Sequence, residues 1–505
     1  MFSWTVAFSA LGIVGFSSAT LWTFLQPMNP DEMEHLHSTY LILQGLRPYE
    51  DFWQNHAPML WLLFAPVMRV WPEGASICYV ARSLAWIGSL LLFLLVVRLA
   101  LDLRPDAVSR SRTIAIAAAG YWIMAIPAEL TIFRPDALMI LGCLLAMWIA
   151  VRAERVAEDP SRLRLWLWCG VLLAAGLSFS TKVFPVVLAA PLAIAIRPGG
   201  LGEKIRSILV YSLGGILGVL PLAVALLAAG NWTSFYRWVV VFNRMRSGAA
   251  QGYETWWMVA FLLAGTVLAV WSLGDPRTWP RRPGLTARFT LAAVLLCSWM
   301  LYPLEQRAFA YYVAPLIACV AIFLPTIQGA GAGPRRTEAR VRPVAVGALV
   351  LALVPVVTGV VPAWEQLRSV RAPETRLANN LTFIQWMIDA GAGTVVECNV
   401  PAHPIYAFDL TPFYVPWQYH YAALTGTRRA RMLRELLERE EPFDEVLERR
   451  KPTLLHILTV RSHLSLLQRA ALIDEAGLDR VRSILVREYR EVNGTLWVRR
   501  SPPPR

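Results

Sequence analysis

The residues most suited to chemistry lie in one acidic stretch that follows the first apolar segment of the chain. Residues 29–58 contain five carboxylates and three histidines. Asn29, Pro30 and Glu32 have the spacing of a capping box, which predicts that a helix begins here and carries Asp31 in its first turn. A carboxylate in that place can simply complement the helix dipole, or it can take a proton from a hydroxyl group. This stretch alone leaves both roles open.

The predicted helix combines an apolar stripe with a polar face that carries Glu34 and His35, a pattern typical of a helix lying on a membrane surface. The stripe consists of Met33, Leu36, Tyr40 and Leu43. Asp31 and His35 are one helical turn apart and could bind a metal ion together with His56. Hydrogen-bonding histidines are the favoured alternative. A divalent metal is therefore compatible with the sequence but not required, and the cofactor stays unassigned.

The composition is that of a polytopic membrane protein. Of the 505 residues, 56% are hydrophobic and 16% are charged, which is too little charge to cover a soluble surface. The net charge of +13 comes mainly from scattered arginines, so no nucleic-acid partner is expected. The six cysteines stand singly and predict neither a disulfide framework nor a zinc site. The first apolar run has no basic residue before it and no cleavage site, which predicts a retained span.

Apolar runs long enough to cross a bilayer predict about eleven spans, which make up a transmembrane domain of residues 1–362. They lie near residues 4–26, 78–101, 113–131, 137–151, 165–181, 183–197, 208–229, 256–273, 288–303, 311–327 and 343–362. The shorter run 58–70 predicts a second interfacial or re-entrant helix in a first outer loop of residues 27–77. Together these features predict a polytopic α-helical fold.

The composition changes after residue 362, where charges become frequent and no spanning run follows. Residues 363–505 are predicted to form a small α/β domain. Its expected strands are 394–397 and 453–458, and Asn493-Gly494 predicts a hairpin. Its expected helices are 374–390, 428–450 and 463–477.

The basic residues of the loops predict the orientation of the chain. With the N-terminus in the cytoplasm, the inner loops carry 19 Lys or Arg residues and the outer loops carry nine. The first outer loop and the C-terminal domain are therefore expected on the extracytoplasmic side.

Several ionisable side chains stand at the predicted outer ends of the spans, where charges are typical of functional sites or wet cavities. They are Arg82, Arg134, Asp136, Lys182, Arg244 and Arg307. Cations there suit a phosphate group, and carboxylates suit a hydroxyl that must lose a proton. Taken singly, each has a structural explanation too: Arg134 can pair with Asp136, and Lys182 can reach lipid headgroups.

The order of these motifs resembles that of the bacterial C-type membrane glycosyltransferases that use polyprenyl-phosphate sugars. This family includes the lipid A aminoarabinose transferases, the galacturonic acid transferases of lipopolysaccharide core and the protein O-mannosyltransferases. The matching pieces are Asp31-Glu32, Pro48-Tyr49-Glu50-Asp51-Phe52, Pro58-Met59-Leu60-Trp61, Arg134-Pro135-Asp136-Ala137-Leu138, Thr181-Lys182 with Pro185, and Arg307 with Tyr311, Tyr312 and Pro315. The chain departs from the aminoarabinose transferases at Gln54-Asn55-His56, where they have a Glu-Lys pair.

The resemblance implies roles for individual residues. Asp31, with Glu32 beside it, would handle the acceptor, and Asp136 matches a second carboxylate of the family. The cations of the later loops would face the lipid phosphate. The implied substrate contacts are Lys182, Arg307, Arg134, Arg244, His56, Tyr311 and Tyr312.

The expected function is that of an inverting glycosyltransferase in the bacterial inner membrane. It would move a hexosyl or pentosyl group from a polyprenyl-phosphate donor to a hydroxyl of an envelope glycan such as lipopolysaccharide, a lipid or a protein, at the outer face. A transporter or flippase for a lipid-linked sugar is the main alternative; it would predict paired halves with helices broken near the midplane, and no internal repeat is visible. An assembly protein with a partner-binding outer domain is a third alternative, which leaves the acidic first loop without a purpose.

Overall fold

The computed structural model describes residues 4–104, 108–126, 128–156, 159–180, 182–242, 256–273, 284–305, 314–326, 368, 377–389, 394–397, 405–406, 408–409, 443–456, 474–493 and 496–500. The chain forms two compact units. Unit 1 comprises residues 1–26, 81–225 and 250–375, and unit 2 comprises residues 27–80, 226–249 and 376–505.

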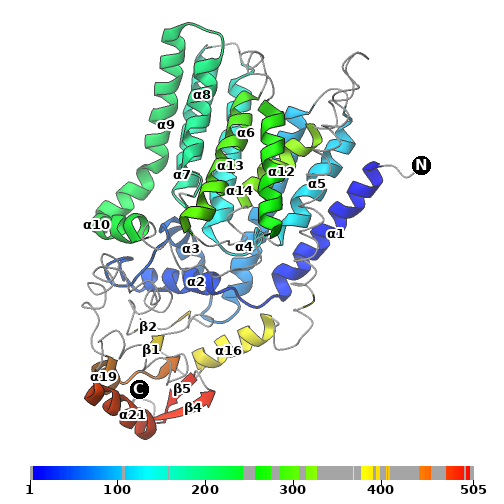
Figure 1. The fold of residues 1–505 in the computed structure, drawn as a ribbon. Helices are drawn as coiled ribbons and strands as arrows, with labels where there is room; N and C mark the ends of the chain where they lie inside the picture. Colours follow the sequence, from blue (N-terminus) through cyan, green and yellow to red (C-terminus); the bar gives the residue numbers. More distant parts are fainter. Residues whose placement is uncertain are drawn as a thin grey trace. The chain divides into compact units, whose positions relative to one another are not determined.

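Helices make up the described part of unit 1 (Figure 1). In chain order they are α1 (Trp4–Leu25), α4 (Ile77–Leu103), α5 (Arg110–Ala125), α6 (Pro135–Ala153), α7 (Asp159–Leu177), the 3-10 helix η1 (Phe184–Leu188), α8 (Ala189–Ile196), α9 (Leu201–Ala228), α12 (Trp256–Leu273), α13 (Leu285–Glu305) and α14 (Ala314–Phe323). Helix α6 packs along α7 and α1 packs along α5, while α13 contacts both α6 and α8.

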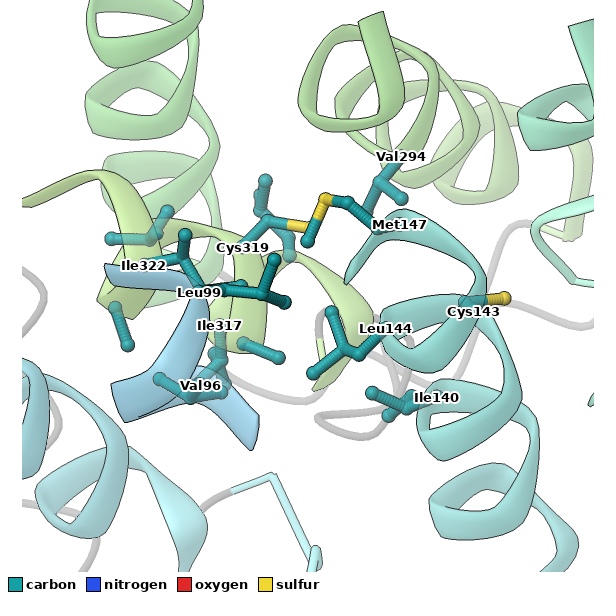
Figure 2. Close-up of a cluster of buried hydrophobic side chains, with 14 of the residues drawn as sticks. Val96, Leu99, Ile140, Cys143, Leu144, Met147, Val294, Ile317, Cys319 and Ile322 are labelled. Carbon is teal, nitrogen blue, oxygen red and sulfur yellow. The ribbon is translucent and has the colours of Figure 1, made fainter. Parts of the chain in front are cut away.

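The interior of unit 1 is apolar, as Figure 2 shows where α4, α6 and α14 meet. The labelled side chains there that are 0 or 1% exposed include Val96, Leu99, Ile140, Leu144, Ile317 and Ile322. Between helices in lipid, close van der Waals packing replaces the hydrophobic effect as the main source of association. The shape of these side chains therefore matters more than their apolar area.

Glycines allow α6, α7 and α9 to approach at backbone contact. A Cβ atom added to Gly142 of α6 would lie 2.5 Å from the Cα atom of Gly176 in α7. A Cβ atom added to Gly170 of α7 would lie 2.1 Å from the carbonyl oxygen of Tyr211 in α9. Small residues at such contacts are the usual means by which membrane helices pack closely. The spacing of these three helices is thus set by main-chain atoms.

The helices of unit 1 occupy the predicted apolar runs as far as residue 326. Four stretches are long and apolar enough to cross a membrane by length and composition, namely Thr5–Leu25, Ile77–Leu103, Pro135–Ala153 and Leu201–Ala228. The chain is therefore an integral membrane protein. The count of about eleven spans stays a prediction, and the run 343–362 lies outside the described residues.

One predicted boundary in unit 1 is wrong. The apolar run over residues 113–131 holds α5, which already ends at Ala125. The chain turns there because Glu129 adopts a left-handed backbone conformation, with φ of 54°. Hydropathy alone runs past this turn, but Pro127, two residues after Ala125, is a sequence signal for a helix end.

Unit 2 begins with the two helices predicted for the first outer loop. Helices α2 (Pro30–Leu43) and α3 (Met59–Val70) pack against each other. On the polar face of α2, Glu34 is partly exposed, whereas His35 and Ser38 are only 1% exposed. Side chains of α3 and of the connecting loop form hydrogen bonds with these two residues and cover them. Two short helices follow in unit 2, α10 (Trp232–Phe235) and the π-helix η2 (Tyr236–Phe242).

The C-terminal part of unit 2 contains a mixed sheet whose five described strands have the order β2-β1-β3-β5-β4. They are β1 (Thr394–Glu397), β2 (Phe408–Asp409), β3 (Leu454–His456), β4 (Tyr489–Asn493) and β5 (Leu496–Arg499). Strand β1 is parallel to β2 and β3, and β5 is antiparallel to β3 and β4. The strand predicted over 394–397 and the hairpin predicted at Asn493-Gly494 are confirmed.

The helices of this part are α16 (Leu377–Asp389), α19 (Phe443–Glu445), the π-helix η8 (Val446–Arg450) and α21 (Glu475–Glu488). Helix α16 confirms the helix expected over 374–390. The helix expected over 463–477 overlaps α21 only at its end, because the Asp474 side chain accepts a hydrogen bond from the Gly477 amide at 2.6 Å and begins α21 there. Residues 410–442 and 457–473 lie outside the described part of the chain.

Candidate functional site

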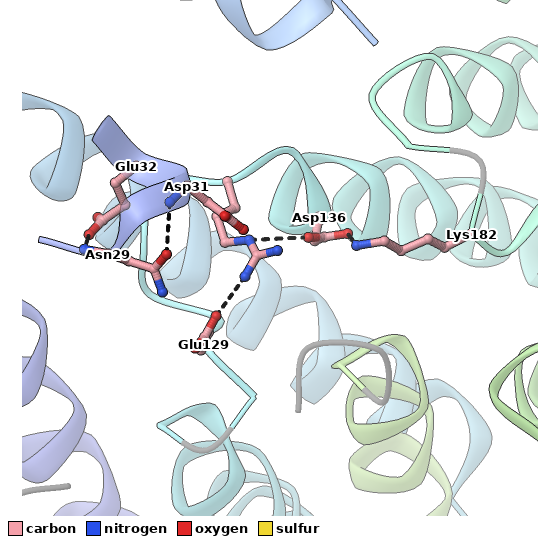
Figure 3. Close-up of polar contacts among 7 residues, drawn as sticks. Asn29, Asp31, Glu32, Glu129, Asp136 and Lys182 are labelled. Atoms are coloured by element: carbon pink, nitrogen blue, oxygen red, sulfur yellow. Dashed lines mark hydrogen bonds and ion pairs between the residues drawn. The ribbon is translucent and has the colours of Figure 1, made fainter. Parts of the chain in front are cut away.

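The predicted capping box at the start of α2 is confirmed. The Asn29 side chain accepts a hydrogen bond from the Asp31 amide at 2.9 Å, and the Glu32 carboxylate accepts one from the Asn29 amide at 2.9 Å (Figure 3). Glu32 is 0% exposed, whereas Asp31 is partly exposed. The geometry therefore gives the Glu32 carboxylate a role in holding the helix end.

His35 of α2 is buried and hydrogen-bonded, and its ring lies against that of the partly exposed His56. Trp61 of α3 donates from its indole nitrogen to Nδ1 of His35 at 3.0 Å, and the rings of His35 and His56 lie 5.0 Å apart, edge to face. An indole N–H can only donate, so Nδ1 of His35 must accept and a neutral ring carries its proton on Nε2. Across the described residues, no group of three or more His, Cys, Asp or Glu side chains is arranged to hold a metal ion.

Residues after α9 hold the loop between α2 and α3. The Asn231 side chain donates to the carbonyl oxygen of Pro48 at 2.9 Å, and the Ser234 hydroxyl bonds to the Glu50 carboxylate. Between them, Tyr49 is 0% exposed and donates from its hydroxyl to the carbonyl oxygen of His56 at 2.6 Å. Burial raises the pKa of Tyr49 well above its ordinary value, so this hydroxyl keeps its proton.

Unit 1 gathers a second group of charges at the N-terminal end of α6. Nζ of Lys182 lies 2.7 Å from Oδ1 of Asp136, and Nε of Arg134 lies 3.6 Å from Oδ2 of the same carboxylate. Nη1 of Arg134 donates to Oε2 of Glu129 at 2.6 Å. These contacts link four charges of alternating sign, and Figure 3 draws them as dashed lines.

The four charged side chains differ in exposure. The side chain of Arg134 is 3% exposed and that of Asp136 7%, whereas Lys182 is 20% and Glu129 22% exposed. A desolvated arginine with carboxylates on it has little freedom to leave them. Lys182 is thus the cation of this group that a ligand reaches more easily.

Glu129 is the member of this group that the sequence did not reveal. It stands outside the Arg134-Pro135-Asp136 motif and inside a run that reads as apolar. An acidic residue five positions before an arginine, as Glu129 is before Arg134, is only a weak indication of an ion pair. Only the turn after α5 brings its carboxylate to Arg134.

Arg82 has a structural role in unit 1. Its side chain is 0% exposed, and Nη1 donates to the carbonyl oxygens of Thr23 at 2.8 Å and Gln26 at 2.7 Å. These carbonyl groups end α1 and have no partner within the helix, so a cation is favourable there. The expectation of a functional role for Arg82 finds no support in this geometry.

The structure thus brings together Arg134, Asp136 and Lys182 in unit 1. The other described candidates, Asp31, Glu32 and His56, belong to unit 2. The remaining predicted substrate contacts lie outside the described residues; they are Arg244, Arg307, Tyr311 and Tyr312.

Comparison with known proteins gives one informative sequence match. No family model matches the chain. A curated relative, the undecaprenyl phosphate-alpha-4-amino-4-deoxy-L-arabinose arabinosyl transferase 2 of Pseudomonas fluorescens, is 28% identical over 255 residues. The resemblance to the polyprenyl-phosphate glycosyltransferases is confirmed. The match covers 48% of this chain and 42% of the arabinosyl transferase, so the chain spans less than half the length of this relative.

Among solved structures, the chain is distantly similar to the oligosaccharyltransferase of Archaeoglobus fulgidus. The apo form gives a TM-score of 0.43 and 15% identity, covering 72% of this chain and 56% of that one. The complex with zinc and sulfate gives a TM-score of 0.38 and 13% identity, covering 69% and 53%. No functional residue is transferred from these structures.

Proposed function

We propose that the chain is an inverting glycosyltransferase that moves a sugar from a polyprenyl-phosphate donor to a hydroxyl group of an acceptor. The observation that carries this proposal is the pair of cations, Arg134 and Lys182, on the single carboxylate of Asp136 at the N-terminal end of α6. The arabinosyl transferase relative is named for an undecaprenyl phosphate sugar. A lipid phosphate is an anion that a cation of this pair can bind.

The chemistry needs cations more than it needs a general acid. Transfer breaks the bond between the anomeric carbon and a phosphate oxygen, and it forms a bond from that carbon to the acceptor oxygen. The departing polyprenyl phosphate gains negative charge, which a cation in place beforehand stabilises. Lys182 fits this role because it is the more exposed cation, while Arg134 remains to neutralise Asp136. Attack opposite to the leaving phosphate inverts the anomeric carbon.

Asp31 is the proposed general base. It is partly exposed and lies in the first turn of α2. Glu32 is occupied by the capping box, and Asp136 would have to leave two cations in order to take a proton. The family motif points to the same residue, since Asp31-Glu32 is the pair that the resemblance assigns to the acceptor.

The cellular setting is part of the proposal. The arginine bias of the loops favours an inner-membrane protein with residues 27–77 and 363–505 on the extracytoplasmic side. An acceptor there would be a hydroxyl of lipopolysaccharide, of another envelope glycan or lipid, or of a protein. The departure at Gln54-Asn55-His56 argues against assuming the aminoarabinose sugar of the relative, so the transferred group is a hexose or a pentose.

Substitution of Asp31 by Asn tests the proposed base. Asn keeps the size of the side chain, and the cap of α2 is Asn29 rather than Asp31, so folding should be nearly unchanged. If Asp31 removes the acceptor proton, turnover should fall by a factor on the order of 100 to 10,000 while the donor still binds. The assay follows release of undecaprenyl phosphate by purified full-length protein from a panel of undecaprenyl-phosphate sugars, with envelope lipids as acceptors.

Glu32→Gln is the matched control, because Gln can still accept the hydrogen bond from the Asn29 amide. We expect it to keep most of the activity. If Asp31→Asn stays active while Glu32→Gln or Asp136→Asn is inactive, the base is the other residue. Activity in all three variants would refute the assignment of the base to any of these carboxylates. Failure of the unmodified protein to release undecaprenyl phosphate from any donor of the panel would refute the enzyme proposal. Movement of the lipid-linked sugar across the bilayer without its consumption would support a flippase instead.

A further inference from the structure

Glu129 occupies a helix end where glycine is the favoured residue. Its amide donates to the carbonyl oxygen of Ile126 at 3.0 Å, and the Leu130 amide donates to that of Ala125 at 3.0 Å. These are the two hydrogen bonds of a Schellman motif, with Glu129 at its left-handed position and φ of 54°. An L side chain is strained there relative to glycine. Residues in such strained conformations are often held there by a functional contact of the side chain.

The carboxylate of Glu129 acts on Arg134. The 2.6 Å ion pair occupies Nη1 of an arginine whose side chain is only 3% exposed. Arg134 in turn faces Asp136, and Asp136 holds Lys182 (Figure 3). With Glu129 present, the four formal charges sum to zero. Without it, the remaining three would sum to one positive charge.

A net charge at this place matters because the reaction changes the charge of its lipid ligand. A sugar linked through phosphate is a diester with one negative charge. The polyprenyl phosphate that remains after transfer is a monoester with a charge between about −1.5 and −2 near neutral pH. A more positive site would therefore hold the product more strongly than the donor.

We propose that Glu129 sets how tightly the site holds the released polyprenyl phosphate. The Glu129 carboxylate keeps Arg134 occupied. Lys182 is then the only cation of this group that leaves Asp136 to bind the phosphate, and the released polyprenyl phosphate can dissociate. The inference rests on the proposed function, because it takes the group around Asp136 to be the phosphate site. Glu129 acts through Arg134 and is thus a positioning residue.

The test uses two variants, Glu129→Gly and Glu129→Gln, in the full-length protein in lipid nanodiscs. Undecaprenyl phosphate is the probe, and its Kd is measured together with its inhibition constant in the transfer assay. Both variants should bind it roughly fivefold to tenfold more tightly, the scale of one nearby unit charge. Turnover should fall because product release slows. Glu129→Gly should lose less thermal stability than Glu129→Gln, because both variants remove one carboxylate from the buried Arg134 and only glycine relieves the left-handed strain.

Lys451→Gly is the matched control. Lys451 also has a left-handed backbone, with φ of 47°, and it belongs to unit 2. This variant should gain thermal stability without any change in the Kd of undecaprenyl phosphate. It shows what relief of backbone strain does away from the group around Asp136.

The outcomes distinguish this inference from the proposed function. If Glu129→Gly and Glu129→Gln leave the Kd unchanged, or weaken binding, Glu129 only ends a helix and the inference is wrong. If Lys182→Gln binds undecaprenyl phosphate as well as the unmodified protein, or the unmodified protein does not bind it, the phosphate site itself is wrong and the inference fails with it.

Discussion

The two ends of helix α6 carry buried carboxylates that are held by different kinds of partner. Asp136, in the first turn, is held by the side chains of Lys182 and Arg134. Glu154, at the C-terminal end, accepts hydrogen bonds from the backbone amides of Leu285 at 3.1 Å and Thr286 at 2.7 Å. The side chain of Glu154 is 0% exposed and that of Asp136 is 7% exposed.

The closest partners of Glu154 are fixed to one helix end. They are the backbone amides at the start of α13 and the Thr286 hydroxyl, which donates to Oε1 of Glu154 at 2.6 Å. The positive end of the helix dipole also favours a carboxylate there. Arg197, at 3.4 Å, completes the set. A main-chain amide cannot turn away to serve another anion, whereas a lysine side chain can. Both carboxylates are buried and both carry one negative charge. The contacts of Glu154 are nevertheless structural, whereas the contact of Asp136 with Lys182 can be exchanged for another anion.

Glu154→Ala should have the largest effect and should act on folding alone. It leaves two amides and Arg197 without their buried partner, which costs about 3 to 5 kcal/mol in the free energy of unfolding. Denaturant unfolding in detergent measures this loss, and Glu154→Gln, which keeps an acceptor oxygen, should lose less. Binding of undecaprenyl phosphate by the folded fraction should not change. A specific loss of binding in Glu154→Ala would erase the contrast between the two ends.

Lys182→Gln should have the opposite profile. If Lys182 holds the donor phosphate, binding should weaken by about 1.5 to 3 kcal/mol, the scale of a charge-assisted hydrogen bond. Folding should be nearly unaffected, because Lys182 is 20% exposed and solvent screens its ion pair. Titration with undecaprenyl phosphate and a thermal unfolding curve give the two values. A large stability loss without any effect on binding would make this end structural as well.

Asp136→Asn should produce the smallest change, in the direction of tighter binding. The phosphate would no longer have to displace a carboxylate from Lys182, so binding of undecaprenyl phosphate should strengthen by up to about 1 kcal/mol. The same titration measures it, with Glu154→Gln as the control at the other end of α6. Weaker binding would instead mean that Asp136 orients Lys182 for the phosphate.

Local signals in the sequence were enough for some of these elements. The capping box at Asn29 and the hairpin at Asn493-Gly494 depend on residues within a few positions of each other, and both were predicted. The ion pair between Asp136 and Lys182 joins residues 46 positions apart, so it depends on the packing of α6 and α7. The role of Arg82 depends on where α1 ends, and that of Glu129 on a left-handed turn that glycine usually marks. Contacts of this kind depend on how distant segments pack, and the pattern of a single sequence does not contain that information.

The contact between Gly142 and Gly176 has a consequence for the tuning of this protein by mutation. Gly142 lies six residues after Asp136, and Gly176 lies six residues before Lys182. A methyl group on either glycine would have to move α6 and α7 apart, because it would lie 2.5 Å or 3.0 Å from the facing Cα atom. An alanine at either place would therefore lengthen the reach required of Lys182 without altering any charged residue. Substitution at Gly142 or Gly176 would thus change the geometry of the Asp136–Lys182 pair from a distance. Mutational screens confined to ionisable residues would overlook this effect.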